Sequence, residues 1–508
     1  MFRWRANAPD NVFSVPLPCK GGVGGGSPHD RGSAAAVVKP TPQSVRADDC
    51  DEMSALWTSG AIARATGGQA SAAFSVSGVA FDSREVGPGD LFVALKGEAT
   101  DGHRFAAQAF AQGAAGVLVS EPVDGPHVRV ADTSIALNAL GAASRERSAA
   151  RIVGITGSVG KTSIKEALFE ALDRARPHAA HRSLKSYNNH VGVPLSLARM
   201  PAASRFGIFE MGMNHAGELA QLTRLVRPHV AVVTMVALAH GAFFADEAAI
   251  ADAKGEIFQG LEPGGTAVIP HDSPHRDRLI AAARPYAGEI VTFGRDPAAD
   301  VWAREGLASG RGTLVSARVR DVDLTFTVTQ PGEHWISNAL AVLATVQAAG
   351  GDLPAAGVAL ADMRGLPGRG RRLPVSAGEG EALLIDEAYN ANPASMRATL
   401  AVLGAEPARR RIAILGSMRE LGPSEEREHA ALAGPIAAAN VDFALLVGSE
   451  MAPLAAALEG RTEFAHVADA AQAAERARAL IGPGDAILVK GSNSIGLARV
   501  VDALAEAA

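Results

Sequence analysis

The run TGSVGKT at residues 156–162 has the residue types and spacing of a phosphate-binding loop. It follows an apolar segment at residues 151–155 and precedes a helical pattern that starts at Lys161, which is the context such a loop requires. Glycines let backbone N–H groups turn toward phosphate oxygens, and the helix N-terminus adds a partial positive charge. We therefore expect a nucleotide site formed by Gly157, Ser158, Val159, Gly160, Lys161, Thr162 and Ser163.

Two side chains of this loop have defined chemistry in such a site. Lys161 would reach the β- and γ-phosphates, and the Thr162 hydroxyl would bind magnesium. The strict pattern has glycine at position 155, where this chain has isoleucine. A plain strand–turn–helix connection is the alternative interpretation of the run.

Three other residues are candidate metal ligands. Glu210 ends an apolar segment at residues 206–210, and a carboxylate at the end of a buried strand beside a phosphate loop can bind magnesium. His240 follows another apolar segment, and Lys254 lies in a helical pattern. Taken alone, each has a simpler interpretation: a surface carboxylate, a satisfied polar residue and a solvated helix charge, respectively.

Composition narrows the class of protein. The chain has 508 residues, which favours two to four domains. Its net charge of −6, from 48 basic and 54 acidic residues, argues against a nucleic-acid partner. Both cysteines, Cys19 and Cys50, precede Met53, so the remainder cannot be a disulfide scaffold. No apolar run approaches the roughly 20 residues that span a bilayer, and no signal peptide is recognisable. We expect a soluble, cytoplasmic protein.

The elements that must position these residues alternate between strands and helices, which predicts parallel sheets covered on both faces. We expect an α/β fold with three domains: a small N-terminal α/β module at 53–146, a central ATPase-like parallel-sheet domain at 147–370 and a C-terminal Rossmann-like domain at 371–508. Residues 1–52 are rich in glycine, proline and alanine and predict a disordered extension, with Met53 as the possible true start. The longest predicted helices beyond the loop lie at 248–261, 334–349 and 425–440.

Taken together, these motifs resemble the Mur ligases, and within that family most closely the member that adds D-alanyl-D-alanine. The similarity runs from about residue 54 to the C-terminus. It is carried by DSR at 82–84, LFVALKG at 91–97, the loop at 156–163, NNHVGVP at 188–194, EMGMN at 210–214, AKGEIF at 253–258, GEHWISNA at 332–339, DEAYNANP at 386–393 and KGS at 490–492. The chain lacks the DNPR tetrapeptide typical of the member that adds the third amino acid. Position 417 is serine, where the family commonly has aspartate.

The resemblance implies roles for individual residues. In such ligases the lysine matching Lys254 is carbamylated and helps to hold a second magnesium ion, and the residues matching His240 and Glu210 are metal ligands. The resemblance also implies that the UDP end of the substrate is held by Ser83, Arg84 and Lys96, and that Asn188 and Asn189 lie in the loop facing its muramoyl side. His334 and Asn338 would lie near the adenine, and Arg369 and Asp386 would belong to the hinge and third-domain surface that closes on ATP.

The activity that the resemblance implies is ADP-forming ligation of D-alanyl-D-alanine to a UDP-N-acetylmuramoyl-tripeptide, through an acyl phosphate, in peptidoglycan precursor synthesis. ATP and two magnesium ions would take part, and the enzyme is expected to be a monomer. The third residue of the tripeptide, diaminopimelate or lysine, stays open. Alternatives are a P-loop switch or transport ATPase, an inactive binding protein and a ligase similar to folylpolyglutamate synthase; the DSR-containing N-terminal module disfavours the last.

Overall fold

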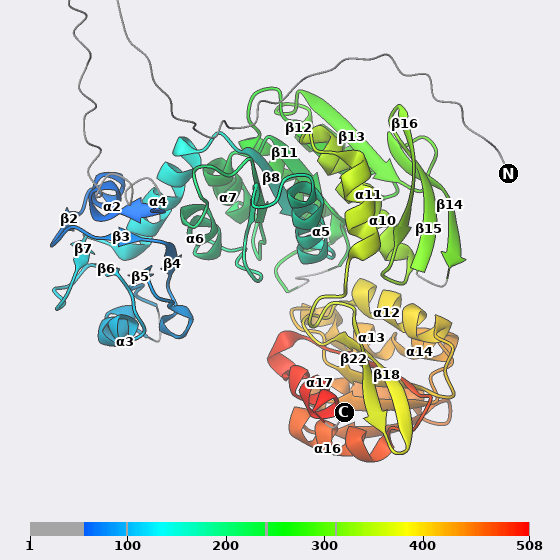
Figure 1. Ribbon diagram of the computed structural model, residues 1–508. Helices are drawn as coiled ribbons and strands as arrows, with labels where there is room; N and C mark the ends of the chain where they lie inside the picture. The colour runs from blue at the N-terminus through cyan, green and yellow to red at the C-terminus, as the bar shows by residue number, and fades with distance from the viewer. Residues whose placement is uncertain (1–54, 98–99, 239–241, 310–311, 507–508) are drawn as a thin grey trace, which may run out of the picture. The chain divides into compact units, whose positions relative to one another are not determined.

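The structure, a computed structural model, describes residues 55–97, 100–238, 242–309 and 312–506 (Figure 1). The predicted extension at 1–52, the possible start at Met53 and the candidate ligand His240 lie outside the described residues. The described chain contains sheets of five, nine and six strands in successive regions, together with a two-stranded pair, β1 (Trp57–Thr58) and β3 (Ser75–Val76). This confirms the predicted α/β class. No helix among the described residues combines the length and apolarity that a membrane span needs.

The N-terminal region is built on the five-stranded sheet, in the order β2-β7-β6-β5-β4. Its strands are β2 (Gln69–Ala70), which is antiparallel to its neighbour, and the parallel strands β4 (Gly78–Ala80), β5 (Asp90–Val93), β6 (Gly116–Val119) and β7 (His127–Arg129). Apolar side chains cover both faces of the sheet. The helices of the region are α2 (Ser59–Thr66), α3 (Ala106–Ala111) and α4 (Thr133–Arg147).

The central region is built on the nine-stranded sheet, in the order β16-β15-β14-β13-β12-β11-β8-β10-β9. The β14–β15 and β15–β16 pairs are antiparallel, and the other pairs of this sheet are parallel. The strands are β8 (Arg151–Thr156), β9 (Ala180–Arg182), β10 (Phe206–Glu210), β11 (Val230–Val233), β12 (Thr266–Pro270), β13 (Glu289–Gly294), β14 (Val301–Ser309), β15 (Gly312–Val319) and β16 (Val322–Val328). Because β8 and β10 are parallel neighbours and Glu210 pairs with Ile155, Glu210 lies beside the start of the phosphate loop.

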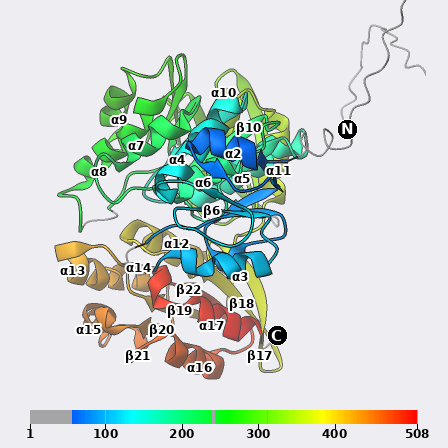
Figure 2. The same ribbon diagram turned by 90° about the vertical axis from the view of Figure 1, so that its left-hand side faces the viewer.

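Helices lie on both faces of this sheet (Figure 2). Two successive residues of β8 pack against different faces. Val153 packs into one core with α5 (Lys161–Arg174), α10 (Glu333–Ala348) and α11 (Leu353–Asp362). Ile152 points to the opposite face and packs with α6 (Gly192–Ala198), α7 (Glu218–Val226), α8 (Glu247–Gly255) and α9 (Arg276–Ala283). Each fully buried side chain of this kind contributes about 1.5–3 kcal/mol of transfer free energy, so both layers hold the loop in place.

The C-terminal region is built on the six-stranded sheet, in the order β17-β18-β22-β19-β20-β21. Only β17 is antiparallel. The strands are β17 (Arg371–Ala377), β18 (Gly380–Glu387), β19 (Arg411–Gly416), β20 (Phe443–Val447), β21 (Glu463–Val467) and β22 (Ala486–Lys490); the helices are α12 (Pro393–Ala405), α13 (Glu425–Ala430), α14 (Ala433–Ala438), α15 (Ala452–Leu458), α16 (Ala470–Leu480) and α17 (Ala498–Ala505). The last strand, β22, inserts between β18 and β19. Ligands of such sheets bind outside the carboxyl ends of strands where the order reverses.

Two predicted helices are shorter than the pattern indicated. The segment at 425–440 is two helices, α13 and α14, separated by a turn at residues 431–432. Pro435 explains the break, because it has no N–H to donate to the carbonyl of residue 431. The segment at 248–261 continues α8 only to Gly255 and then tightens into a 3₁₀ helix, Glu256–Gly260.

Candidate active site

The phosphate loop is held in an open turn by two glycines and by the segment after β11. Gly160 is left-handed at φ 89° and begins α5, and no side chain caps that helix. Gly157 approaches Thr234 so closely that a β-carbon would lie 1.8 Å from its hydroxyl oxygen. The Thr234 hydroxyl in turn donates to the Val159 carbonyl at 2.6 Å. The uncapped helix N-terminus therefore faces the loop, as anion binding requires.

Lys161, Thr162 and Glu210 come together at this helix start. Lys161 Nζ donates to the Gly157 carbonyl at 2.7 Å, and Thr162 Oγ1 donates to Glu210 Oε2 at 2.8 Å. Asn188 Nδ2 donates to the other oxygen of this buried carboxylate, also at 2.8 Å. Burial lowers the pKa of Lys161, and Arg369 lowers it further while Glu210 opposes the shift. A phosphate group would relieve this cost, since it offers Lys161 a negative partner.

A cavity of about 750 Å³ joins this loop to the C-terminal region. From the sequence-predicted set it is lined by Ser158, Val159, Gly160, Lys161, Thr162, Ser163, Asn188, Glu210, His334, Asn338 and Arg369. Arg369 donates to Ser186 Oγ at 3.2 Å and lies over the Tyr389 ring, with its guanidinium carbon 4.2 Å from the ring centroid. Burial lowers the pKa of His334 to about 4, so its imidazole is neutral at pH 7.

The opposite wall of the cavity is made by the carboxyl ends of the C-terminal sheet. Glu387 ends β18, Lys490 ends β22, and the two residues are register partners. Their side chains meet at 3.4 Å (Nζ to Oε2). The sequence interpretation included both residues in matching segments but gave neither a role. The rule used for Glu210, a charged residue at the end of a buried strand, also picks out both of them.

Two predicted site residues are engaged elsewhere. Asp386 is buried and accepts from the Gly368 N–H at 2.7 Å and the Ala388 N–H at 3.3 Å, and it does not line the cavity. Asn189 Oδ1 accepts from the N–H of Val191 at 3.2 Å and of Gly192 at 2.9 Å, which fixes the turn into α6. Their geometry favours holding the hinge and the loop in shape over contacting a ligand in the cavity.

Lys254 lies on α8 and is 2% exposed. Its ammonium group forms no hydrogen bond or ion pair with any of the described residues. Burial lowers its pKa well below the usual value, and the charge of Lys161 lowers it further. An unpaired buried ammonium is costly, so this environment favours an uncharged amine or a modified side chain that no longer carries a positive charge on nitrogen.

The three residues predicted to hold the UDP end lie outside the cavity that contains the phosphate loop. Ser83 is buried and its hydroxyl donates to Gln108 Oε1 at 3.3 Å. The side chain of Arg84 is 82% exposed and pairs with Asp82 at 2.6 Å, whereas Lys96 is 71% exposed and lies 3.9 Å from Asp101. Arg84 holds the pKa of Asp82 down to about 2.

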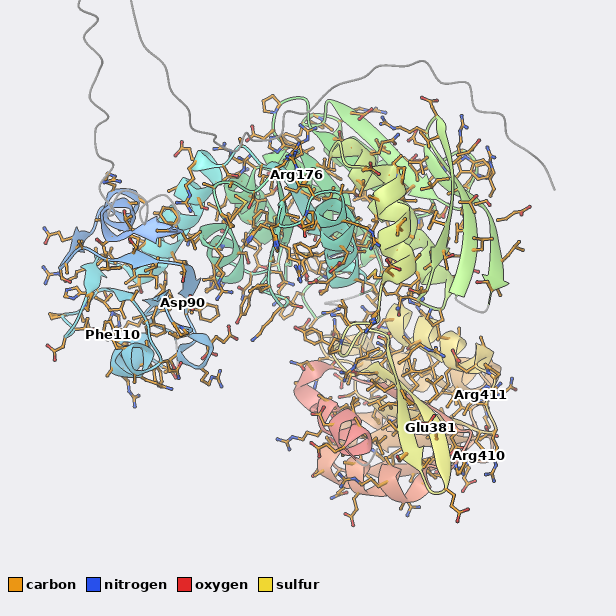
Figure 3. The ribbon with its side chains drawn as sticks, in the orientation of Figure 1. Asp90, Phe110, Arg176, Glu381, Arg410 and Arg411 are labelled. Carbon is orange, nitrogen blue, oxygen red and sulfur yellow. The ribbon has the colours of Figure 1, made fainter. Side chains whose placement is uncertain are left out.

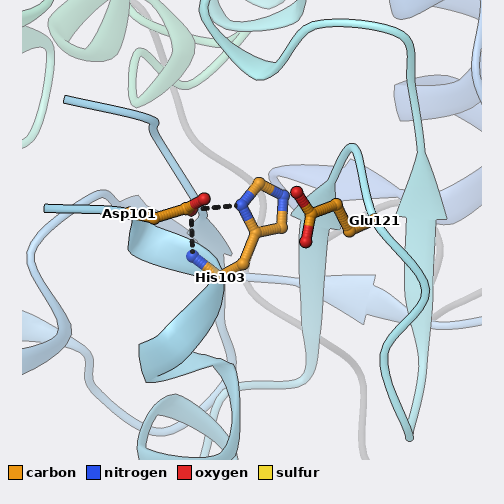
Figure 4. Close-up of side chains that lie close together, drawn as sticks. All are labelled: Asp101, His103 and Glu121. Atoms are coloured by element: carbon orange, nitrogen blue, oxygen red, sulfur yellow. Dashed lines mark hydrogen bonds and ion pairs between the residues drawn. The ribbon is translucent and has the colours of Figure 1, made fainter. Parts of the chain in front are cut away.

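Asp101, His103 and Glu121 also gather in the N-terminal region (Figure 4). His103 Nδ1 lies 2.6 Å from Asp101 Oδ1, and His103 Nε2 accepts from the Ser120 N–H at 2.9 Å. Because a backbone N–H occupies Nε2, the proton must be on Nδ1, and neither nitrogen has a lone pair for a metal. This cluster is a structural clamp between the turn at 101–103 and β6.

Comparisons with known proteins agree with this arrangement. Family profiles match at residues 75–167 (Mur ligase family, catalytic domain), 155–346 (Mur ligase middle domain) and 371–493 (Mur ligase, glutamate ligase domain). The UDP-N-acetylmuramoyl-tripeptide–D-alanyl-D-alanine ligase of Escherichia coli (strain K12) is 36% identical over 437 residues, covering 85% of this chain and 94% of that protein. Its counterpart of the same name in Bacillus subtilis (strain 168) is 31% identical over 444 residues, covering 85% and 93%. A crystal structure of MurF from Acinetobacter baumannii superposes with a TM-score of 0.76 at 30% identity, covering 89% of this chain and 99% of that one. The chain belongs to the Mur ligase family.

Proposed function

We propose that this chain is the ATP-dependent, ADP-forming ligase that joins D-alanyl-D-alanine to UDP-N-acetylmuramoyl-tripeptide in the cytoplasm. The names of the relatives supply the substrates. The observation that supports the reaction is one cavity in which a phosphate loop faces the charged strand ends of a second sheet. A switch or transport ATPase has no need of that second wall.

The nucleotide would bind along the central wall of the cavity. Backbone N–H groups at the start of α5 and the Lys161 ammonium suit its phosphates. The adenine end is assigned to His334 and Asn338, which line the same cavity. Asn338 lies close to the phosphate loop: a β-carbon added to Gly160 would be 3.0 Å from Asn338 Oδ1. A neutral His334 suits an uncharged base. Arg369 adds a cation that reaches the cavity from the hinge.

A magnesium ion fits the Thr162 and Glu210 pair, because a hydroxyl and a carboxylate oxygen are the hard ligands that this ion prefers. When bound, the ion neutralises phosphate charge. Asn188 would keep the Glu210 carboxylate oriented toward the loop.

A second magnesium site is assigned to Lys254 and His240. An ammonium group cannot ligate a cation, but its carbamate can. The lowered pKa of Lys254 favours the uncharged amine, which is the form that reacts with carbon dioxide. The resulting anion would also balance the nearby charge of Lys161.

The chemistry begins when the terminal carboxylate of the tripeptide attacks the γ-phosphate and becomes an acyl phosphate. Lys161 would lower the repulsion between the two anions, because its ammonium group lies at the phosphate loop. The amine of the dipeptide then attacks the acyl carbon and phosphate leaves. The enclosing C-terminal wall would keep water from hydrolysing the acyl phosphate first.

The UDP end of the substrate is assigned to Ser83, Arg84 and Lys96, and the muramoyl side to Asn188, whose loop is held in shape by Asn189. A physical connection joins these two groups. The Tyr187 hydroxyl donates to both oxygens of Glu85, the residue after Arg84, at 2.8 Å. A ligand held at Arg84 would therefore be tied to the loop that carries Asn188.

A coupled assay tests the proposal. ADP should accumulate over many turnovers only when ATP, magnesium, the tripeptide nucleotide and D-alanyl-D-alanine are all present, and the product should gain the mass of the dipeptide less one water. Parallel reactions with diaminopimelate- and lysine-containing tripeptides would name the natural substrate. ADP release that is independent of both co-substrates would instead indicate an ATPase.

A further inference from the structure

The Glu387–Lys490 pair is the one charged pair at the carboxyl ends of the described C-terminal strands that also lines the cavity. Lys490 is buried, and its Nζ donates to the Asn390 carbonyl at 2.9 Å and to Glu387 Oε2 at 3.4 Å. The lysine is thus committed to groups of its own sheet. The side chain of Glu387 stays 17% exposed.

Glu387 differs from the other acids of the cavity because one of its carboxylate oxygens is available to accept a hydrogen bond from a ligand. Its Oε1 accepts no hydrogen bond from any of the described residues. By contrast, both oxygens of Glu210 accept side-chain bonds, and both oxygens of Asp272 accept backbone N–H groups. Glu420 is engaged as well. Glu387 therefore presents the open acceptor of this cavity.

The surroundings of Glu387 suit a proton acceptor. Burial raises the pKa of its carboxyl group, and Asp386 raises it further, while Lys490 and Arg369 oppose the shift. A carboxylate with a raised pKa takes a proton more readily than an exposed one, and Lys490 keeps it ionised until a proton arrives.

The proposed reaction requires such a group. An amino group exists mainly as an ammonium ion near neutral pH, and an ammonium ion has no lone pair with which to attack a carbonyl carbon. The nucleophile must therefore lose a proton inside the closed cavity. Glu387, on the wall opposite the phosphate loop, could accept this proton.

We propose that Glu387 binds the ammonium group of the incoming D-alanyl-D-alanine through Oε1 and removes one proton from it, and that Lys490 is the residue that positions Glu387. This inference rests on the proposed function. It names the side chain that receives the second substrate.

Two protons leave the ammonium nitrogen as the amide bond forms. One N–H proton moves from the ammonium ion to Glu387, which leaves a neutral amine. The nitrogen lone pair forms the C–N bond, and the acyl C–O bond breaks with its electron pair going to phosphate. The nitrogen then loses a second proton to the departing phosphate, and Glu387 returns its own proton to water when the products leave.

A different role for the pair, binding of a nucleotide phosphate, is disfavoured by its charges. Lys490 is already shared between a carboxylate and a carbonyl, and a phosphate placed beside Glu387 would be repelled. The two roles make different predictions, since a phosphate ligand is needed for the first half of the reaction and an amine acceptor only for the second.

The test is Glu387→Gln, assayed with two nucleophiles in the presence of ATP and the tripeptide nucleotide. D-alanyl-D-alanine enters as an ammonium ion, whereas hydroxylamine is uncharged near neutral pH and traps the acyl phosphate as a hydroxamate without help from a base. The matched control is Glu381→Gln, an exposed glutamate on the same strand (Figure 3). Glu387→Asp tests whether a shorter carboxylate restores part of the rate.

We expect Glu387→Gln to lower kcat for the dipeptide by about 100-fold, the usual effect of losing a general base, while hydroxamate formation stays near the wild-type rate. Retained hydroxamate formation also reports a folded enzyme. Loss of both reactions would assign Glu387 to activation of the tripeptide and overturn the inference, as would unchanged ligation. If wild-type enzyme neither ligates the dipeptide nor forms a hydroxamate, the proposed function fails and this inference falls with it.

Discussion

The phosphate loop and the predicted UDP site differ in how their residues are held. Thr162, Glu210 and Asn188 are joined by hydrogen bonds of 2.8 Å, and the loop backbone is fixed by close approach of Gly157 to Thr234. In the N-terminal region, Arg84 and Lys96 extend into solvent from separate turns. The phosphate loop therefore has its binding geometry before a ligand binds. The side chains of the predicted UDP site would have to change conformation to contact a ligand.

The difference follows from what each site must recognise. A phosphate loop uses backbone N–H groups, so its shape is set by glycines and by the sheet that it follows. A site built from long cationic side chains needs no such shape, because the side chains can swing onto the ligand at a cost in rotamer entropy. Substitutions should therefore have large effects on turnover in the first region and smaller effects, confined to substrate affinity, in the second.

The largest effect is expected for Lys161→Ala. Loss of a cation that faces charge developing in the transition state should lower kcat by about 10³-fold. Circular dichroism should match wild type, because Lys161 Nζ bonds only its own loop among the described residues. Activity within tenfold of wild type, with an intact spectrum, would show that the loop does not bind the reacting phosphate.

Lys254→Ala should follow, with a loss of about 100-fold if the residue supplies a carbamate ligand. Acetate or formate should restore part of the activity by placing a carboxylate in the space left by the side chain. Wild-type enzyme prepared without carbon dioxide should lose activity and recover it on addition of bicarbonate. A high-resolution map of the active, magnesium-loaded enzyme with an unmodified amine would refute the assignment.

Gly157→Ala should have a smaller effect, limited to the nucleotide. The new β-carbon would lie 1.8 Å from Thr234 Oγ1, so the loop must shift and the bond from Thr234 to Val159 must loosen. We expect kcat/KM for ATP to fall by about tenfold to 100-fold, as for other displacements of about 1 Å. Gly264→Ala is the control, because that glycine also has a positive φ but has open space around it. An equal loss of kcat/KM in both variants would mean that backbone strain, not the loop, is responsible.

The same contrast explains what the sequence could predict. The loop, β8 and β10 were identifiable because an apolar run, a glycine turn and a charged strand end all occur within short stretches of chain. α6 was not predicted, since all seven of its residues are buried and it shows no polar face. The edge strand β21 is only partly buried and was missed as well. The pairing of Glu387 with Lys490 depends on β22 inserting next to β18, about 100 residues earlier in the chain, and local patterns carry no such information.

Arg84→Ala should have the smallest effect and a different character. Its side chain is 82% exposed and forms hydrogen bonds, among the described residues, with Asp82 alone, so removing it should leave the melting temperature unchanged. If Arg84 contacts the UDP phosphates, KM for the tripeptide nucleotide should rise about tenfold, since a charged hydrogen bond contributes about 1.5–3 kcal/mol and part of that is regained by water. The value of kcat should stay the same, and the increase in KM should shrink at high salt. Arg104→Ala, a change at another exposed arginine of the same region, is the control. A KM that does not change would place the UDP end elsewhere, whereas a fall in kcat would mean that the N-terminal site is as preformed as the phosphate loop and that the contrast between the two regions is wrong.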